Sequence, residues 1–63
     1  MTFEIYRTRP LIRRAEWRWR LKADNGRIIA DSGEGYRSRA DCLHGVTLVR
    51  RSAPGADIEF EPL

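Results

Sequence analysis

Cys42 and His44 are the two residues of this chain best suited to serve as a nucleophile and a general base. A cysteine attacks as its thiolate, and a neighbouring histidine can accept the thiol proton. Their spacing argues against such a pair, because side chains two residues apart on a helix diverge by roughly 200° around its axis. We therefore expect Cys42 to be a small core residue, His44 to be a surface residue, and neither to be catalytic.

The same two residues exclude the usual staples of a small protein. An intramolecular disulfide needs two cysteines, and a closed structural zinc site needs four ligands, whereas this chain has one cysteine and one histidine. We therefore predict no metal and no cofactor. The carboxylates of Asp31 and Glu34 lie near Gly33 and Gly35, but no titratable residue is placed to perturb them, and this glycine pair lacks the context of a phosphate loop. We predict no catalytic residue.

The alternation of tryptophan and arginine from Trp17 to Arg20 resembles the composition of a surface that binds single-stranded nucleic acid. Such surfaces need their aromatic rings exposed beside the cations. In a strand, however, successive side chains point to opposite faces, which separates Trp17 and Trp19 from Arg18 and Arg20. We expect the tryptophans in the core and the arginines on a solvated face braced by glutamates.

A weaker polyanion hypothesis survives at the basic loop between residues 7 and 16. The candidate contacts are Arg7, Arg9, Arg13, Arg14, Arg18 and Arg20. A dimer would display two copies of this patch, which would strengthen a weak electrostatic contact. The net charge of +3 is mild, and several glutamates are expected nearby, so nucleic acid is an unsupported partner at this stage.

Length sets the strongest constraint on the fold. Residues 1–63 form one domain, and a chain of this size buries only ~60% of the surface that it exposes when unfolded. Small chains usually gain support from a disulfide, a metal or a partner chain. Because the first two are excluded, a second copy of this chain is the expected support.

Periodicity and turn residues predict the sheet. Residues 15–23 alternate strictly between apolar and polar side chains, as in a strand with one buried face. Asn25-Gly26 then predicts a two-residue hairpin turn with positive φ angles, followed by a strand over about 27–31. A further strand is expected over about 2–7, and Gly33 to Tyr36 is expected to be a flexible connection.

The second half of the chain predicts a helix and a final strand. Ser38 is a suitable N-cap, and the helix should span about 39–52, where Pro54-Gly55 ends it. Its inward stripe comprises Leu43, Val46 and either Val49 or the stem of Arg50, with Cys42 beside it. The segment 56–61 alternates again and predicts a strand. The predicted core comprises Trp17, Trp19, Leu21, Ile28, Val46, Val49, Ile58 and Phe60, of which Trp17, Trp19, Leu21, Ile58 and Phe60 would also support a dimer.

These residues together resemble the YegP-like family of small bacterial and archaeal proteins of unknown function, as a member with a single repeat. The resemblance rests on Phe3-Glu4-Ile5-Tyr6, Trp17-Arg18-Trp19-Arg20-Leu21, Ala23, Asn25-Gly26, Ile28-Ile29-Ala30, Ser32, Gly35-Tyr36, Ser38, Ala40, Cys42, Gly45, Val49 and Ala53-Pro54. Two features depart from the family pattern. The basic loop is longer than expected, and His44 stands where an asparagine is expected.

The resemblance implies an α+β fold built from a β(3)-α-β unit, an antiparallel sheet with one helix on one face. It further implies that two units form one continuous sheet by exchanging their C-terminal strands. A single unit therefore implies a homodimer, in agreement with the need of a small core for support. Whether the last strand is exchanged or folds back locally stays open at this point.

The expected function is that of a small non-enzymatic domain, a homodimeric protein-interaction or stress-associated module. The alternative is weak, salt-sensitive nucleic-acid binding through the basic loop. No apolar run approaches the ~20 residues of a membrane span, and the first residues lack the layout of a signal peptide. We therefore expect a cytoplasmic protein that has no membrane partner.

Overall fold

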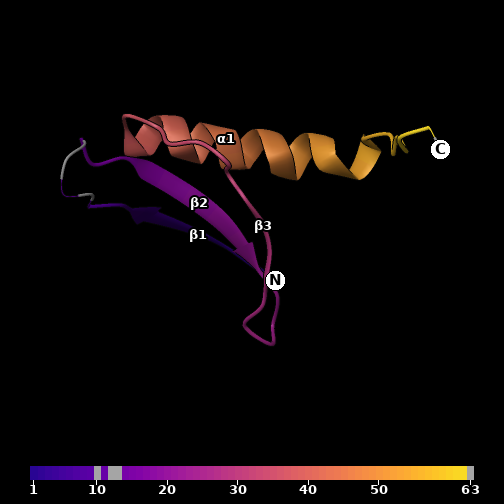
Figure 1. The fold of residues 1–63 in the computed structure, drawn as a ribbon, viewed down its shortest axis with the longest axis horizontal. Helices are drawn as coiled ribbons and strands as arrows, with labels where there is room; N and C mark the ends of the chain where they lie inside the picture. The colour runs from indigo at the N-terminus through magenta and orange to yellow at the C-terminus, as the bar shows by residue number, and fades with distance from the viewer. Residues whose placement is uncertain (10, 12–13, 63) are drawn as a thin grey trace.

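The described residues form a three-stranded antiparallel sheet with one α-helix lying along one of its faces (Figure 1). The computed structural model describes residues 1–9, 11 and 14–62. The elements are β1 (Thr2–Arg7), β2 (Trp17–Lys22), β3 (Ile28–Asp31), α1 (Arg39–Ser52) and a 3₁₀ turn (Ala53–Gly55). The fold is thus of the expected α+β class, with one antiparallel sheet and one helix.

β2 is the central strand of the sheet, whose order is β1-β2-β3. It pairs antiparallel with β1, so that Ile5 stands opposite Trp19 and Glu4 opposite Arg20. The strict alternation in β2 accordingly places Trp19 toward the helix and its charged neighbours on the outer face. A register shift between Leu21 and Lys22 interrupts the pairing of β2 with β3.

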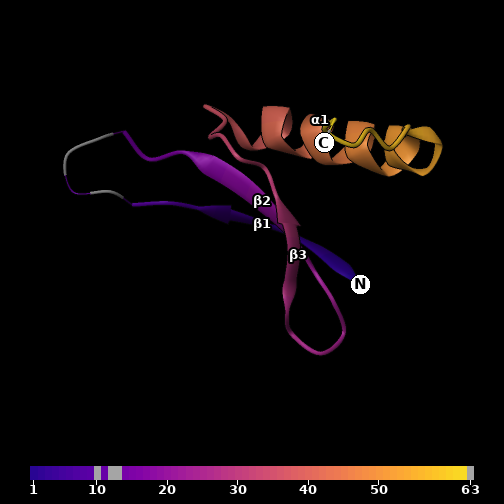
Figure 2. The same ribbon diagram turned by 45° about the vertical axis from the view of Figure 1, so that its right-hand side comes forward.

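The turn between β2 and β3 has three residues rather than the predicted two (Figure 2). Ala23 N–H donates to the Arg27 carbonyl at 2.8 Å, and Gly26 N–H donates to the Ala23 carbonyl at 2.9 Å. Gly26 has a φ of +88°, whereas Asn25 has no positive φ. The Asn25 side chain accepts a hydrogen bond from Arg27 N–H at 3.0 Å. Within this turn, only Gly26 takes the left-handed conformation that glycine adopts without strain.

Helix α1 spans the residues that the sequence predicts for it. Ser38 has extended backbone angles, and its side-chain oxygen accepts a hydrogen bond from Asp41 N–H at 3.1 Å. This cap satisfies one of the free amides of the first turn. Arg50 and Arg51 lie in the last turn, where cations favour the negative end of the helix dipole.

The core is small and is centred on Trp19, Cys42 and Val46. Cys42 is fully buried, whereas Leu43 is 52% exposed. The predicted inward stripe is therefore rotated, because one residue corresponds to about 100° around a helix and the sheet meets the face that carries Cys42, Val46 and Val49. The partly buried residues around this cluster are Phe3, Ile5, Trp17, Tyr36 and Val49.

The predicted strand over 56–61 does not form within the single chain. Ile58 is 82% exposed and Phe60 is 88% exposed, although both were expected in the core. The 3₁₀ turn directs the chain beyond the end of α1, away from the sheet, so within the described residues the C-terminal segment adds no fourth strand to the sheet (Figure 1). Ile28 is also half-exposed, because it lies beside the register shift on the edge strand β3.

Tyr36 belongs to an ordered contact rather than to the flexible connection expected there. Its N–H and carbonyl both bond to the backbone of Trp17, each at 2.8 Å. Its ring packs beside Gly45 of α1, where an added Cβ would lie 2.5 Å from the Tyr36 hydroxyl oxygen. The absence of a side chain at Gly45 therefore lets the helix pack against this ring.

Substituting Gly45 tests this contact. Glycine-to-alanine changes inside helices normally stabilise by up to ~1 kcal/mol. We expect Gly45→Ala to destabilise the fold by about 1 kcal/mol instead, because the new methyl group overpacks against Tyr36. Urea unfolding followed by tryptophan fluorescence measures the change. In a Tyr36→Phe background, which lacks the hydroxyl, the same substitution should cost less, and an equal cost in both backgrounds would contradict the assignment.

Candidate functional site

The structure gives Cys42 and His44 no shared chemistry. Cys42 is fully buried between α1 and the sheet, and this burial raises the pKa of its thiol. His44 is exposed. A buried thiol with a raised pKa carries little thiolate, so it is a poor nucleophile. Within residues 1–9, 11 and 14–62, no group of three or more His, Cys, Asp or Glu side chains could hold a metal ion.

The Asp31 carboxylate and the Glu34 backbone carbonyl accept hydrogen bonds within the loop that carries the two glycines. Asp31 Oδ1 accepts a hydrogen bond from Gly33 N–H at 2.8 Å, and Gly33 has a φ of +72°. Ser32 Oγ donates to the Glu34 carbonyl at 2.9 Å. These bonds shape the turn that leads from β3 toward α1, as expected for a short polar turn.

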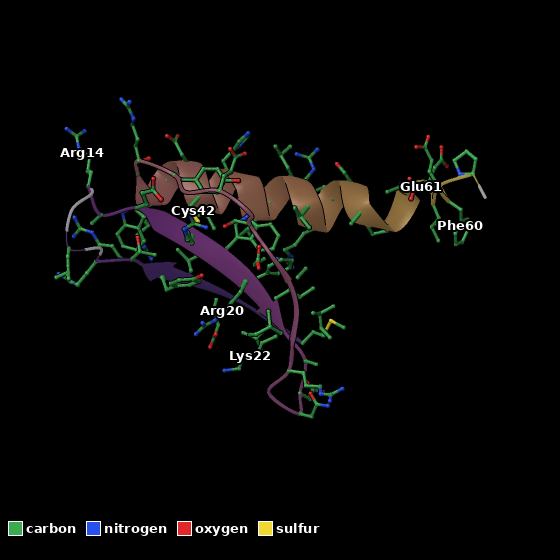
Figure 3. All side chains as sticks on the ribbon, viewed as in Figure 1. Arg14, Arg20, Lys22, Cys42, Phe60 and Glu61 are labelled. Carbon is green, nitrogen blue, oxygen red and sulfur yellow. The ribbon has the colours of Figure 1, made fainter. Side chains whose placement is uncertain are left out.

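Glu4 is the centre of the charged outer face of the sheet. Arg20 Nε donates to Glu4 Oε1 at 2.8 Å, and Lys22 Nζ lies 3.3 Å from Glu4 Oε2. The hydrogen bond from Arg20, with that from Lys22, holds the pKa of Glu4 below its ordinary value of 4.5. The Arg20 guanidinium also stacks 4.7 Å from the centroid of the Tyr6 ring. Figure 3 shows Arg20 and Lys22 on the side of the sheet away from α1.

The other arginines of the proposed polyanion patch are divided between two environments. Arg18 Nη2 lies 3.4 Å from Glu16 Oε2, and the Arg7 guanidinium lies 5.8 Å from the centroid of the Trp17 ring. Arg9 and Arg14 are exposed. Arg13 lies outside the described residues. The six arginines therefore do not form a continuous row of unpaired cations, because Arg18 and Arg20 form ion pairs with carboxylates.

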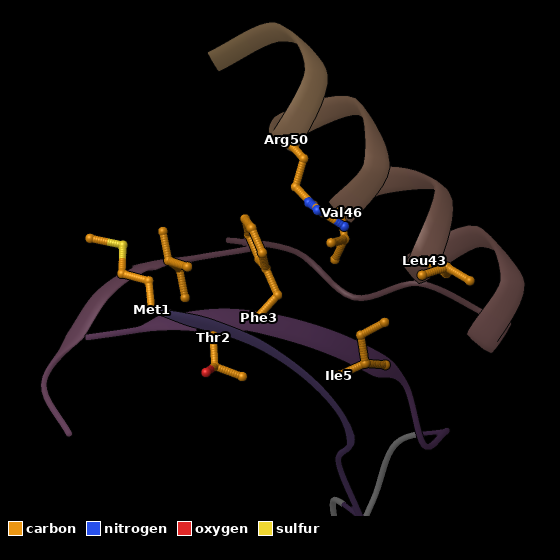
Figure 4. A pocket seen from close by; sticks show the side chains of 8 residues that line it. Met1, Thr2, Phe3, Ile5, Leu43, Val46 and Arg50 are labelled. Atoms are coloured by element: carbon orange, nitrogen blue, oxygen red, sulfur yellow. The ribbon is translucent and has the colours of Figure 1, made fainter. Parts of the chain in front are cut away.

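An apolar groove of about 540 Å³ lies between β1 and α1, next to the core. Its lining comprises Met1, Thr2, Phe3, Ile5, Leu21, Leu43, Val46 and Arg50. Figure 4 shows Phe3 and Ile5 pointing from β1 toward Val46 and Leu43 of the helix. Of the two long sides of β1, only one is paired, because β1 is an edge strand of the described sheet.

The groove was not predicted from the sequence. The available signal was the inward pair Phe3 and Ile5 on a strand at the edge of the sheet, together with Leu43 beside the helical stripe. These residues are apolar but surround a groove instead of a filled core. The two apolar residues that were expected to fill the core, Ile58 and Phe60, lie exposed in the C-terminal segment. The single chain thus has an unpaired edge at β1, an unfilled apolar groove and an exposed apolar segment at its C-terminus.

The described residues contain no helix that is both long enough and apolar enough to cross a bilayer.

Comparisons with known proteins place this arrangement in a family. The model of a domain of unknown function, DUF1508, matches residues 14–59. A UPF0339 protein of Treponema denticola is 46% identical over 56 residues, which cover 89% of this chain and 88% of that protein. A UPF0339 protein of Neisseria meningitidis serogroup B is 42% identical over 59 residues, covering 94% of this chain and 96% of that protein.

Two further matches add length and structure. A UPF0339 protein of Stutzerimonas stutzeri is 47% identical over 60 residues, which cover 95% of this chain but 49% of that longer protein. The NMR solution structure of a protein from Haloferax volcanii superposes with a TM-score of 0.79 at 42% identity. That match covers 95% of this chain and 93% of the other.

The pKa of Glu4 predicts an acid-dependent loss of stability. A carboxyl group whose pKa is lowered by folding stabilises the native state above its ordinary pKa, and this contribution disappears as the pH falls through the folded value. We expect Glu4→Gln to lower the urea midpoint at pH 7 and to have a diminishing effect below pH 4.5. The control is Glu34→Gln, whose effect should not follow this pH dependence. A pH-independent effect of Glu4→Gln would contradict the role of the ion pairs.

Burial of Cys42 predicts slow reaction with thiol reagents. In the native protein, an aromatic disulfide reagent should modify this thiol at least about a hundredfold more slowly than in concentrated urea, because modification requires local or global opening. Absorbance of the released thiolate measures both rates. Rapid modification of the native protein, at a rate close to that in urea, would show that Cys42 is accessible.

Proposed function

We propose that this chain, which belongs to the DUF1508 family of domains of unknown function, acts as a non-enzymatic homodimeric binding module. In this dimer, the C-terminal segment of each chain fills the groove beside β1 of the other. The observation that carries the proposal is the presence, in one chain, of an apolar groove and an exposed apolar segment that do not meet.

The chemistry of the segment suits the groove. Ile58 and Phe60 alternate with acidic residues, so in an extended conformation both face one side. Placed along β1, that side would meet Phe3 and Ile5, while the acidic side chains would face solvent. Burying side chains of this size contributes ~1.5–3 kcal/mol each, which is substantial beside the small core of one chain.

The backbone supports the same arrangement. β1 is an edge strand, and an unpaired edge exposes N–H and carbonyl groups that favour pairing with another strand. The 3₁₀ turn directs the C-terminal segment away from the sheet of its own chain. Exchange between two copies would pair both edges at once, and two-fold symmetry would make the two contacts identical.

The lengths of the relatives are consistent with a unit that works in pairs. This chain covers 49% of the Stutzerimonas stutzeri protein, a length that would accommodate two such units, whereas it covers nearly all of the Neisseria meningitidis protein. A two-unit chain could form within one molecule the arrangement proposed here for two molecules. The narrower YegP-like assignment, with its exchanged strands, belongs to this proposal.

A binding role is favoured over catalysis. The thiol of Cys42 is buried, and the groove is lined mainly by apolar side chains that offer no acid or base. The edge of β3 remains open in the proposed dimer, and its isoleucines are half-exposed, which suits addition of a strand from a protein partner. The predicted association with stress and the cytoplasmic location stay predictions.

Weak nucleic-acid binding through the basic loop stays the alternative. The positive net charge supports it, but Arg18 pairs with Glu16 and Arg20 with Glu4. Its salt dependence would separate it from the binding of an apolar segment, because contacts with phosphates weaken steeply as salt is added whereas apolar contacts do not.

The mass in solution tests the proposed dimer. Light scattering should give about 14.6 kDa, twice the 7.3 kDa of one chain, and this mass should survive dilution and high salt. In the double variant Ile58→Ser with Phe60→Ser, the mass should fall toward that of one chain, because the segment loses its apolar side chains. Circular dichroism of both proteins would show whether loss of the dimer also unfolds the chain.

The control is Leu11→Ser, which removes a fully exposed apolar side chain from the loop between β1 and β2. It should leave the dimer mass unchanged. A wild-type mass of 7.3 kDa, or a double variant that retains the dimer mass, would refute the exchange.

A further inference from the structure

We propose that Arg14 and Arg37 form a binding site for a dianionic phosphate group. Both arginines line one polar pocket of about 480 Å³, which shares no lining residue with the apolar groove. Arg14 precedes β2 (Figure 3). Arg37 directly precedes Ser38, the N-cap of α1. The site is independent of the proposed dimer, because every residue that lines it comes from one chain.

Backbone hydrogen bonds hold the two sides of this pocket together. Trp17 and Tyr36 exchange two bonds of 2.8 Å, which fix the segment before α1 beside the start of β2. Thr8 N–H donates to the Glu16 carbonyl at 2.8 Å, and Glu16 N–H donates to Thr8 Oγ1 at 3.2 Å. The pocket is thus bounded by backbone whose position is set by the sheet. Its full lining is Arg14, Ala15, Glu16, Gly35, Tyr36 and Arg37.

Gly35 and Glu16 approach closely within the pocket. An added Cβ at Gly35 would collide with the Glu16 carboxylate, whose Oε2 is the nearest atom, so this carboxylate lies directly over the glycine backbone. Its carboxylate lies 3.4 Å from Arg18 Nη2. This partner offsets the negative charge that Glu16 brings to the pocket, and the two remaining guanidinium groups give the site its positive character.

The charge and shape of the site favour phosphate. Neither Arg14 nor Arg37 forms an ion pair within the part of the chain that the structure describes. Two guanidinium groups supply two positive charges, and their planar forks match the oxygen geometry of a phosphate. The positive end of the α1 dipole lies at the same end of the molecule, because the helix begins at Arg39.

The volume of the pocket favours a phosphate attached to a small organic group. About 480 Å³ exceeds what a bare phosphate ion occupies, and pockets of small-molecule size begin at ~300 Å³. The residues beyond the pocket do not extend it into a nucleic-acid track, because Arg18 and Arg20 pair with glutamates. A phosphomonoester is therefore the ligand class that fits, and inorganic phosphate is its simplest probe.

Titration of the labelled wild-type protein with inorganic phosphate at pH 8 and constant ionic strength tests the site. We expect saturable shifts of the amide signals of Gly35 and Arg37 with phosphate, and none with chloride. A mononucleotide such as AMP should bind the same residues. In the double variant Arg14→Gln with Arg37→Gln, the affinity should fall at least about tenfold, the effect of losing one charge-assisted hydrogen bond.

The matched control is Arg27→Gln with Arg51→Gln, which removes the same charge from the β2–β3 turn and the end of α1. This variant should bind phosphate with unchanged affinity. Equal losses in both double variants would show that net charge, rather than the pocket, attracts the anion and would overturn the proposal. Binding of a single-stranded oligonucleotide without binding of phosphate or AMP would overturn it in favour of an extended nucleic-acid contact. Both outcomes can be read whether the protein is a monomer or a dimer.

Discussion

The packing of Trp19 against Cys42 and Val46 is the contact on which the rest of this structure depends. A large indole on the central strand needs a small residue on the helix opposite it, and Cys42 provides one that is fully buried. Phe3 completes the contact from β1 with an edge-to-face approach to Trp19 at 5.6 Å between ring centroids. Because this core is so small, the apolar residues around it are only partly covered, and the groove beside β1 is the consequence.

The two faces of the sheet differ in chemistry: the inner face is apolar and the outer face is charged. The inner face binds the helix, whereas on the outer face Glu4 receives Arg20 and Lys22 from the neighbouring strand. Surface ion pairs contribute little individually, about 0–1 kcal/mol, so this ladder is better understood as a polar cover that offsets the charge of the central strand. The number of arginines alone is therefore a poor guide to an anionic partner, because some of these cations are already paired with glutamates. The arginines that form no ion pair within the described residues are the more informative ones.

The edge strands and the C-terminal segment connect the fold to its proposed function. The apolar groove and the unpaired strand edge lie at β1, whereas the exposed apolar residues lie in the C-terminal segment. In the single chain they do not meet, because the segment after α1 runs beyond the end of the helix, away from the sheet. In the proposed exchange, the C-terminal segment of one copy pairs with the β1 edge and fills the groove of the other copy. The proposed phosphate pocket is formed within one chain, where the backbone pairing of Trp17 with Tyr36 holds the segment before α1 beside the start of β2.

The sequence by itself determined the elements whose signals are local. Alternation identified β2, and the Ser38 cap with Pro54 bounded the helix, because periodicity and capping act within a few residues. Only the tertiary structure decided that the helix faces the sheet with Cys42 rather than Leu43, that Tyr36 packs on Gly45, and that Arg14 and Arg37 line one pocket. Each of these depends on how separate elements are rotated and placed against one another, and local patterns carry no record of that placement.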